Sequence, residues 1–324
     1  MNTNVVGVDM GGTKILSAVV DGEGKILGTA KIPTNAKSNT SIVIDRIADC
    51  IRKAIDDAHV DKKSIEAIGI GAPAVLDPDT GVVIFAPNLG WKSVPLKSEL
   101  EARINMPTFV DNDVNVGTLG EHAFGAGQNV ENLVGIFVGT GIGGGIVLNG
   151  QLFHGASKTA GEIGHIIVKA DGPKCGCGRR GCLEALASRT AITKQLQKAI
   201  QKKGKKSILT ELTNGDLELI RSGTLAKALR SKDKLTIKVF KDITKYLGVG
   251  IGSIVNFLNP EMIVLGGGVV EALDETFIKN IRKAAKKYAL PDTLKNVQIV
   301  AAQLGDNAGV LGAAALARQR LAAG

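Results

Sequence analysis

Hydrophobic and polar positions at the start of the chain form short runs rich in β-branched residues. Three such runs, separated by glycine-containing turns, lie at 5–9, 15–20 and 25–29. This pattern predicts three antiparallel strands. Between residues 41 and 60 the apolar positions recur at helical spacing instead, so a helix is expected to follow the strands.

The remainder of the chain alternates short apolar runs with longer segments at helical spacing. Short buried strands are predicted at 65–71, 108–110 and 263–265, and a second strand meander from residue 133 onward. Helices are predicted at 190–203, 224–231, 235–258 and 308–321. Forty-one glycines and only nine prolines among 324 residues suit many tight turns between strands and helices. The sequence therefore predicts an α/β protein of about two domains.

The two predicted meanders resemble each other at a constant offset of 128 residues. Gly7 then pairs with Gly135, and Gly11 with Gly139. Two copies of a strand, a glycine-rich turn and a strand predict two domains that face each other, each offering backbone N–H groups to one end of a polyphosphate. The alternative is that both copies are ordinary glycine hairpins.

Composition and charge narrow the class of protein further. Hydrophobic residues make up 44% of the chain, which supports a folded core, and the formal net charge is +9. The dense lysine runs near 198–206 and 282–287 are interpreted as solvated helix faces, because no aromatic residues interleave with them as nucleic-acid binding would need. No secretory signal opens the chain, and glycines interrupt its longest uncharged stretch, 132–157. A cytoplasmic protein without a membrane or nucleic-acid partner is expected.

Residues 139–144 match the G-x-G-x-x-G pattern of dinucleotide-binding sites and follow a predicted strand. The next segment, 145–150, is predicted to be another strand and turn rather than a helix. No acidic residue follows about twenty positions later in a second strand. A Rossmann dehydrogenase is therefore not expected.

A histidine and three cysteines form the most specific cluster in the sequence. His165 precedes a Cys-x-Cys pair by ten residues, and a third cysteine follows five residues later, giving the set His165, Cys175, Cys177 and Cys182. Three thiolates and one imidazole are suited to a closed tetrahedral zinc site, which leaves no position for a reactive water. Structural zinc is predicted; the alternative is three free thiols.

Several carboxylates lie close to predicted turns. Glu162 precedes His165 by three residues and Glu184 follows Cys182 by two, so a bound metal would bring both carboxylates into one region suited to polyol hydroxyls. Asp111 and Asp113 follow a short strand, where either could accept a hydroxyl proton or serve as a turn residue.

Together these motifs resemble the ROK family of sugar kinases, and within it the bacterial ATP-dependent glucokinases. The residues that carry the resemblance are Asp9-Met10-Gly11-Gly12-Thr13-Lys14, Asn88-Leu89-Gly90-Trp91, Asn112-Asp113-Val114-Asn115, 139–144, Gly161-Glu162-Ile163-Gly164-His165, the Cys-Gly-Cys-Gly-x-x-Gly-Cys-x-Glu run ending at Glu184, and Gly266-Gly267-Gly268. They occur in family order and span nearly the whole chain.

The resemblance implies an α/β, two-domain actin-like ATPase (ribonuclease H-like) fold with an inter-domain cleft. The implied domains are a small N-terminal domain, 1–117, completed by the C-terminal helix at 305–324, and a large domain, 118–304, that carries the zinc. The implied activity is transfer of the ATP γ-phosphate, with Mg²⁺, to the 6-hydroxyl of glucose. Homodimers or homotetramers are expected from the same resemblance.

The resemblance also assigns roles to individual residues. Asp113 is the implied general base, and Asp9 is expected to orient Mg²⁺ through water. The implied nucleotide-binding residues are Asp9, Gly11, Gly12, Thr13, Lys14, Gly139, Thr140, Gly141, Gly266 and Gly267. The implied sugar-binding residues are Asn88, Asn112, Asp113, Glu162, His165 and Glu184, where His165 uses one ring nitrogen for zinc and the other for sugar.

Two departures from the family pattern affect sugar choice. Pro73-Ala74 stands where many members have Pro-Gly, and Gly155-Ala156-Ser157-Lys158 stands where many have Gly-Ala-x-Gly. Mannose, fructose, allose or N-acetylmannosamine therefore remain alternative substrates, and polyphosphate an alternative donor. A sugar-sensing, non-enzymatic repressor of the same family is not expected, because its helix-turn-helix would precede the first phosphate turn and Asp9 lies almost at the N-terminus.

Overall fold

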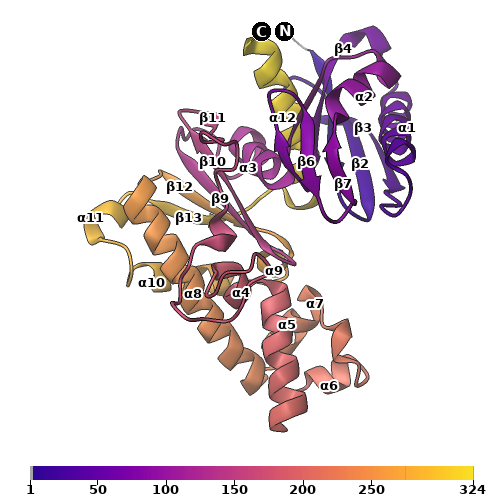
Figure 1. Cartoon of the computed structure of the whole chain (residues 1–324). Coiled ribbons are helices and arrows are strands. Elements are labelled where there is room, and N and C mark those ends of the chain that lie inside the picture. The colour runs from indigo at the N-terminus through magenta and orange to yellow at the C-terminus, as the bar shows by residue number, and fades with distance from the viewer. Residues whose placement is uncertain (1–2, 274, 324) are drawn as a thin grey trace. The chain divides into compact units, whose positions relative to one another are not determined.

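A computed structural model of the chain describes residues 3–273 and 275–323 (Figure 1). The chain divides into two compact units. The first unit comprises Met1–Gly135, Gly145–Gly161 and Gln303–Gly324, and the second comprises Ile136–Gly144 and Glu162–Ala302. The C-terminal helix thus groups with the N-terminal part of the chain, and the first unit also takes in 118–135 and 145–161.

In the described residues, the first unit is built on a five-stranded sheet of order β3-β2-β1-β4-β8. Its strands are β1 (Asn4–Met10), β2 (Lys14–Val20), β3 (Ile26–Pro33), β4 (Ile65–Ala72) and β8 (Thr108–Asn112). The first three strands pair antiparallel, whereas β4 and β8 join in parallel. The predicted strands at 5–9, 15–20, 25–29, 65–71 and 108–110 are confirmed, each within a few residues.

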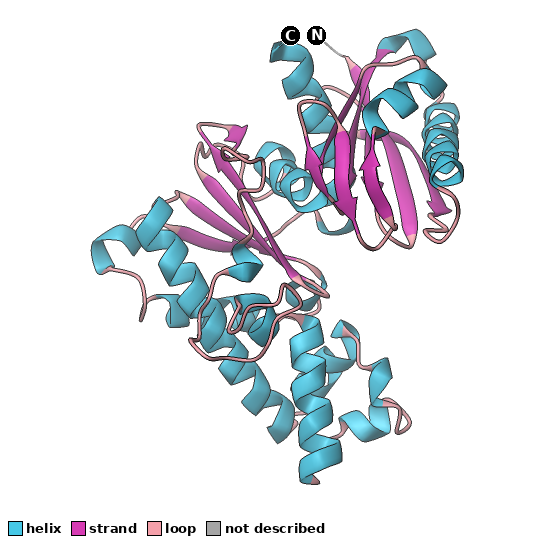
Figure 2. Cartoon of the chain, in the orientation of Figure 1, coloured by secondary structure: helices cyan, strands magenta, loops and turns pink. Residues whose placement is uncertain are grey.

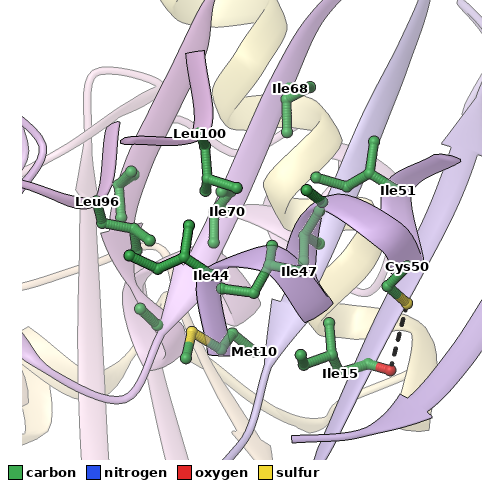
Figure 3. Close-up of a cluster of buried hydrophobic side chains, with 14 of the residues drawn as sticks. Met10, Ile15, Ile44, Ile47, Cys50, Ile51, Ile68, Ile70, Leu96 and Leu100 are labelled. Atoms are coloured by element: carbon green, nitrogen blue, oxygen red, sulfur yellow. Dashed lines mark hydrogen bonds between the residues drawn. The ribbon is translucent and has the colours of Figure 1, made fainter. Parts of the chain in front are cut away.

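Side-chain alternation along β1 divides the core between the two faces of this sheet. Val6, Val8 and Met10 belong to the cluster that includes residues of α1 (Thr40–Ala58). Figure 3 shows this cluster, in which the Cys50 thiol donates to the Ile15 carbonyl. The opposite face packs against α12 (Ala308–Ala323), which is the predicted C-terminal helix. Because side chains alternate along a strand, β1 supplies both cores.

Close approach of α12 to the sheet depends on glycines that face it. A Cβ at Gly7 would collide with the Val310 carbonyl, and one at Gly69 with the Ala313 carbonyl. On the other side of the helix, Gly312 meets the Val116 carbonyl of α3 (Asp113–Phe124) in the same way. The β1 glycine that marks the sequence repeat is therefore needed for helix packing.

A small antiparallel sheet of order β5-β6-β7 in the described chain has no counterpart among the sequence predictions. Its strands are β5 (Val75–Asp77), β6 (Val82–Ala86) and β7 (Trp91–Val94), and α2 (Leu96–Ile104) follows. The runs are short and mix exposed with buried positions, so their apolar pattern is weak. Trp91, the single tryptophan of the sequence, is 1% exposed and anchors this sheet in the core.

A second five-stranded sheet of the described chain has the order β11-β10-β9-β12-β13, which repeats the order of the first sheet. Its strands are β9 (Leu133–Val138), β10 (Ile142–Leu148), β11 (Gln151–Leu152), β12 (Met262–Gly266) and β13 (Gln298–Ala301). The repeat predicted from the glycines is confirmed by this shared order. The strand β10 also confirms that no helix follows the glycine-rich segment 139–144.

The second unit is mainly helical outside its strands (Figure 2). Its helices are α4 (Leu183–Ala187), α5 (Arg189–Gln197), α6 (Leu209–Leu212), α7 (Ser222–Arg230), α8 (Lys234–Leu258), α9 (Gly268–Glu271), α10 (Glu275–Ala285) and α11 (Pro291–Leu294). The predicted helices at 190–203, 224–231 and 235–258 are confirmed, with a π-helical turn over 198–202. Among the described residues, no helix combines the length and apolarity required to cross a bilayer.

Candidate functional site

The first glycine turn lies between β1 and β2 in the first unit. Within the turn, Gly11 N donates to the Lys14 carbonyl at 2.9 Å. The buried Thr34, which follows β3, stabilises the turn because its hydroxyl donates to the Gly11 carbonyl at 2.6 Å. Thr13 is exposed at the tip. The turn is therefore fixed while its tip stays accessible to a ligand.

Asp9 ends β1 beside this turn and is half-buried. Burial raises the pKa of its carboxyl; the nearby Asp306 adds to this effect, while the Lys14 ammonium opposes it. An acidic group set among charges at the mouth of a glycine turn is suited to a hydrated divalent cation. The backbone of Gly309 in α12 lies against the Asp9 side chain and limits its movement.

The second glycine turn, between β9 and β10 in the second unit, occupies the corresponding place after the first strand of its sheet. Gly139 N donates to the Gly141 carbonyl at 2.9 Å, and Ile142 N donates to Glu184 Oε2 at 3.0 Å. The Arg189 guanidinium donates to the exposed Thr140 hydroxyl at 2.6 Å. This turn thus presents a hydroxyl and a cation together.

A third glycine segment ends β12 and begins α9. Gly267 has a φ of +84°, and a Cβ there would lie 2.8 to 2.9 Å from backbone atoms of Val138. The position therefore requires glycine on two independent grounds. The absence of a side chain at Gly267 thus allows the end of β12 to pack directly against the backbone of Val138 in β9.

Asp111, Asn112 and Asp113 occupy the junction of β8 and α3. The Asn112 side chain is the N-cap: its Oδ1 accepts from Val114 N at 2.9 Å and Asn115 N at 3.3 Å, and its Nδ2 donates to the Ala74 carbonyl at 3.2 Å. Burial, with a further contribution from the Asp9 charge, raises the pKa of Asp113 to about 7, although the Val114 N–H opposes this rise.

Asp111 differs from its neighbour because both of its oxygens are occupied. Oδ1 accepts from Asn112 N at 2.7 Å and from Asn115 Nδ2 at 3.0 Å, and Oδ2 contacts His154 Nε2 at 2.6 Å. The side chain is 1% exposed. Of the two acids left open by the sequence, Asp113 is the one whose position and pKa suit proton transfer near neutral pH.

The structure brings the four predicted metal ligands together. The ligand atoms of His165, Cys175, Cys177 and Cys182 all lie within 4.8 Å of one another. Cys175 Sγ is 3.7 Å from His165 Nδ1, and Cys177 Sγ is 3.7 Å from Cys182 Sγ. Burial and the neighbouring thiols raise the pKa of Cys182 to about 12. Three thiols and one imidazole at these separations form a donor set that could hold a metal ion.

The remaining predicted sugar-binding residues fall in both units. In the second unit His165 Nε2 lies 3.9 Å from Glu162 Oε2, and Glu184 Oε1 lies 3.9 Å from Cys175 Sγ. Glu184 therefore contacts both the cluster and the second glycine turn. In the first unit Asn88 lies close to the first turn, its Cβ 3.8 Å from where a Cβ on Gly12 would stand.

Sequence reasoning missed two residues of these sites, His154 and Arg189. His154 lies 43 positions from its partner Asp111, and Arg189 lies 49 positions from Thr140. Neither residue belongs to a motif that includes its partner. A signal was nevertheless present for Arg189, since it immediately follows Ser188, the N-cap of a predicted helix near the cysteine segment.

Two sheets of the same strand order, each with a glycine turn after its first strand, define the two-domain actin-like ATPase fold. A model of the ROK family matches residues 5–320. The chain therefore belongs to the ROK family.

Known proteins of similar sequence and structure extend this result. A glucokinase from Halalkalibacterium halodurans is 38% identical over 316 residues, which cover 97% of this chain and 95% of that protein. The crystal structure of a ROK family glucokinase from Streptomyces griseus, in complex with glucose and AMPPNP, superposes with a TM-score of 0.83 at 36% identity, covering 98% of this chain and 99% of that one. The xylose repressor of Bacillus subtilis is 30% identical over 95% of this chain and 75% of its own length.

Proposed function

We propose that this chain is an ATP-dependent glucokinase that transfers the γ-phosphoryl group of ATP to the 6-hydroxyl of glucose. Support comes from the similarity to glucokinases over nearly the full length of both chains. The match covers 95% of the Halalkalibacterium halodurans glucokinase and 75% of the Bacillus subtilis xylose repressor, and the sequence identity is higher to the glucokinase. The geometry of the first unit supplies the chemical argument.

The observation that carries the proposal is the Asp113 carboxyl at the N-terminus of α3. A general base works best when its pKa lies near the working pH, and that of Asp113 is raised to about 7. Asp113 accepts the proton of the sugar hydroxyl as its oxygen attacks phosphorus. Asp111 does not take this role, because both of its oxygens already accept hydrogen bonds.

Phosphoryl transfer depends mainly on positioning and on neutralisation of phosphate charge. Gly12 and Thr13 in the first turn, and Thr140 in the second, offer N–H and hydroxyl groups to the phosphates. Lys14 and Arg189 provide positive charge beside these turns. Gly266 and Gly267 are assigned to the adenosine from the resemblance to the family's glycine segment.

The donors near Asp9 fit Mg²⁺, since carboxylate and water oxygens are the ligands this ion prefers. Asp9 holds the hydrated ion, and the ion when bound neutralises charge on the transferring phosphates. Because burial and Asp306 already disfavour an anion at Asp9, a cation there relieves the cost of ionising it.

The donor set of the cysteine cluster fits structural zinc. Zinc bonds of about 2.3 Å to sulfur and 2.0 Å to nitrogen place tetrahedral ligand atoms about 3.6 to 3.8 Å apart. Two separations in the cluster, Cys175 Sγ to His165 Nδ1 and Cys177 Sγ to Cys182 Sγ, are each 3.7 Å. His165 contributes Nδ1 to the metal and keeps Nε2 for the sugar beside Glu162.

Sugar hydroxyls are assigned to Asn88, Asn112, Glu162, His165 and Glu184 together with the base. The Asn112 side chain lies beside the base, since it forms a hydrogen bond with Asp113 in addition to capping the helix. The four ligands would hold zinc as a structural ion, and the segment that bears Glu162, His165 and Glu184 would thereby be fixed.

The test is release of ADP from Mg-ATP with glucose, mannose, fructose, allose, N-acetylglucosamine and N-acetylmannosamine, using protein whose zinc content has been measured. A clear preference for glucose is expected, and one zinc per chain. Preference for another hexose would refute the assigned substrate but retain the kinase, and faster turnover with polyphosphate would refute the assigned donor.

Asp113→Asn provides the second arm of this test, with Glu99→Gln as its control. Glu99 is also an acid in the first turn of a helix in the first unit, but it pairs with Arg103 on the surface. Asp113→Asn is expected to abolish turnover while glucose binding persists in calorimetry, and Glu99→Gln to match the wild type. Turnover by Asp113→Asn above a tenth of the wild-type rate would exclude Asp113 as the base.

A further inference from the structure

His154 contacts Asp111 in the interior of the first unit. Its Nε2 lies 2.6 Å from Asp111 Oδ2, and the two side chains are 15% and 1% exposed. His154 lies two residues after β11, whereas Asp111 lies near the end of β8. The contact therefore joins two segments that are distant in sequence.

The Asp111 side chain in turn holds the first turn of α3. Its other oxygen accepts from the backbone N–H of Asn112 and the side-chain amide of Asn115. Asp113 lies between these two residues. The position of the proposed base therefore depends on Asp111, and the position of Asp111 depends on His154.

The backbone of His154 closes the loop that follows it. Its carbonyl accepts from Ala160 N at 2.9 Å, and the preceding residue, Phe153, donates its N–H to the Ile146 carbonyl at 2.8 Å. The bond between Ala160 N and the His154 carbonyl joins the two ends of the loop Gly155–Ala160, which leads directly to Gly161 and Glu162. His154 thus holds the base of the loop with its backbone and the helix of Asp113 with its side chain.

The loop also forms an ion pair with another segment of the first unit, and this ion pair is exposed to solvent. Lys158 pairs with Asp79 at 2.7 Å, with side chains 38% and 53% exposed. Exposed ion pairs hold a segment weakly, because water and salt screen them. The buried contact of His154 with Asp111 is therefore the stronger constraint on how the loop and α3 lie together.

We propose that His154 is a positioning residue for the sugar acceptor: through Asp111 it aligns the proposed base Asp113 with the loop leading to Glu162. This inference rests on the proposed function. It predicts effects on glucose KM and on kcat, but not on ATP KM, because the phosphate turn at Gly11–Lys14 is held separately by Thr34.

Three variants test the role of the side chain. His154→Leu removes the donor to Asp111, whereas His154→Gln keeps an amide N–H at a similar distance from the backbone. His122→Leu is the matched control: His122 Nε2 contacts the Val130 carbonyl at 2.8 Å in the same unit but does not contact Asp111.

We expect His154→Leu to lower kcat at least tenfold and raise glucose KM several-fold, with ATP KM within twofold of the wild type. His154→Gln should recover kcat to within about threefold. Kinetic constants of His154→Leu within twofold of the wild type would overturn the proposal. So would equal losses in His122→Leu, or no recovery in His154→Gln, because a general loss of stability would then explain the effect.

Limited trypsin digestion supplies a readout that does not depend on activity. Lys158 lies in the loop that His154 closes, so cleavage after it should be several-fold faster in His154→Leu than in the wild type or His122→Leu. Unchanged cleavage would refute the structural link even if kcat fell. If the wild type phosphorylates no hexose, the proposed function fails, while the digestion still decides whether His154 orders the loop.

Discussion

Replacing Asp113 by Asn should change both the activity and the pH dependence of stability. Burial and the charge of Asp9 raise the pKa of Asp113 to about 7 in the folded protein, compared with 3.8 for an exposed Asp. A difference of about three pKa units corresponds to about 4 kcal/mol. Because Asp113 is partly accessible to solvent, this figure is the upper limit of the effect on folding.

The sign of the effect follows from proton binding. Between pH 3.8 and about 7 the folded state holds a proton on Asp113 that the unfolded chain releases. The contribution of this group to stability is therefore complete below pH 3.8 and is lost as pH rises through 7. Asn does not titrate, so Asp113→Asn should gain stability relative to the wild type between pH 4 and pH 8, by at most about 4 kcal/mol.

Two assays test this reasoning. Urea unfolding of the wild type and Asp113→Asn at pH 5 and pH 8 gives the stability difference at each pH. Initial rates at low glucose and saturating Mg-ATP should rise tenfold per pH unit up to about pH 7 and then level off, because the base acts only when ionised. A flat rate profile between pH 5.5 and 8, or a stability difference that does not grow with pH, would refute the reasoning.

Three further predictions concern stability and phosphate binding. Glu121→Gln should lower the free energy of unfolding by about 1–3 kcal/mol in urea titrations, because the fully buried carboxylate accepts backbone N–H groups of Ala126, Gln303 and Leu304. Gly312→Ala should cost about 1–3 kcal/mol and lower Tm, since its Cβ would overlap the α3 backbone. Arg189→Ala should raise ATP KM several-fold while leaving glucose KM unchanged, as steady-state kinetics would measure.

The first three strands and the long helices α1, α8 and α12 could be predicted because their signals are local, whereas the short sheet β5-β6-β7 could not. Along β1 the residues Val6, Val8 and Met10 face one core and Val5 faces the other. The apolar character of these residues is therefore enough to predict that they are buried. The role of Gly7 could not be predicted in this way. Gly7 is needed because a side chain there would collide with Val310 of α12, which lies about three hundred residues later in the chain.

In the candidate site too, the residues that are close together in the sequence could be predicted, and the contacts between distant residues could not. The metal ligands lie within 18 residues, from His165 to Cys182, so their spacing alone predicted the cluster that the structure forms. Strand position alone left the choice between Asp111 and Asp113 open, because both follow the same predicted strand, and only the family resemblance assigned the base to Asp113. The deciding contact comes from His154, which a reading of local motifs does not connect to β8.

The raised pKa of Asp113 is unexpected for an acid at a helix N-terminus, where free N–H groups normally stabilise a carboxylate. At this helix the cap explains the difference. Asn112 accepts from the N–H groups of Val114 and Asn115, and of these only Val114 also donates to Asp113, at 3.0 Å. The remaining stabilisation is smaller than the effects of burial and of the Asp9 charge. The Asn-Asp pair therefore combines a well-capped helix with an acid that is able to accept a proton near neutral pH.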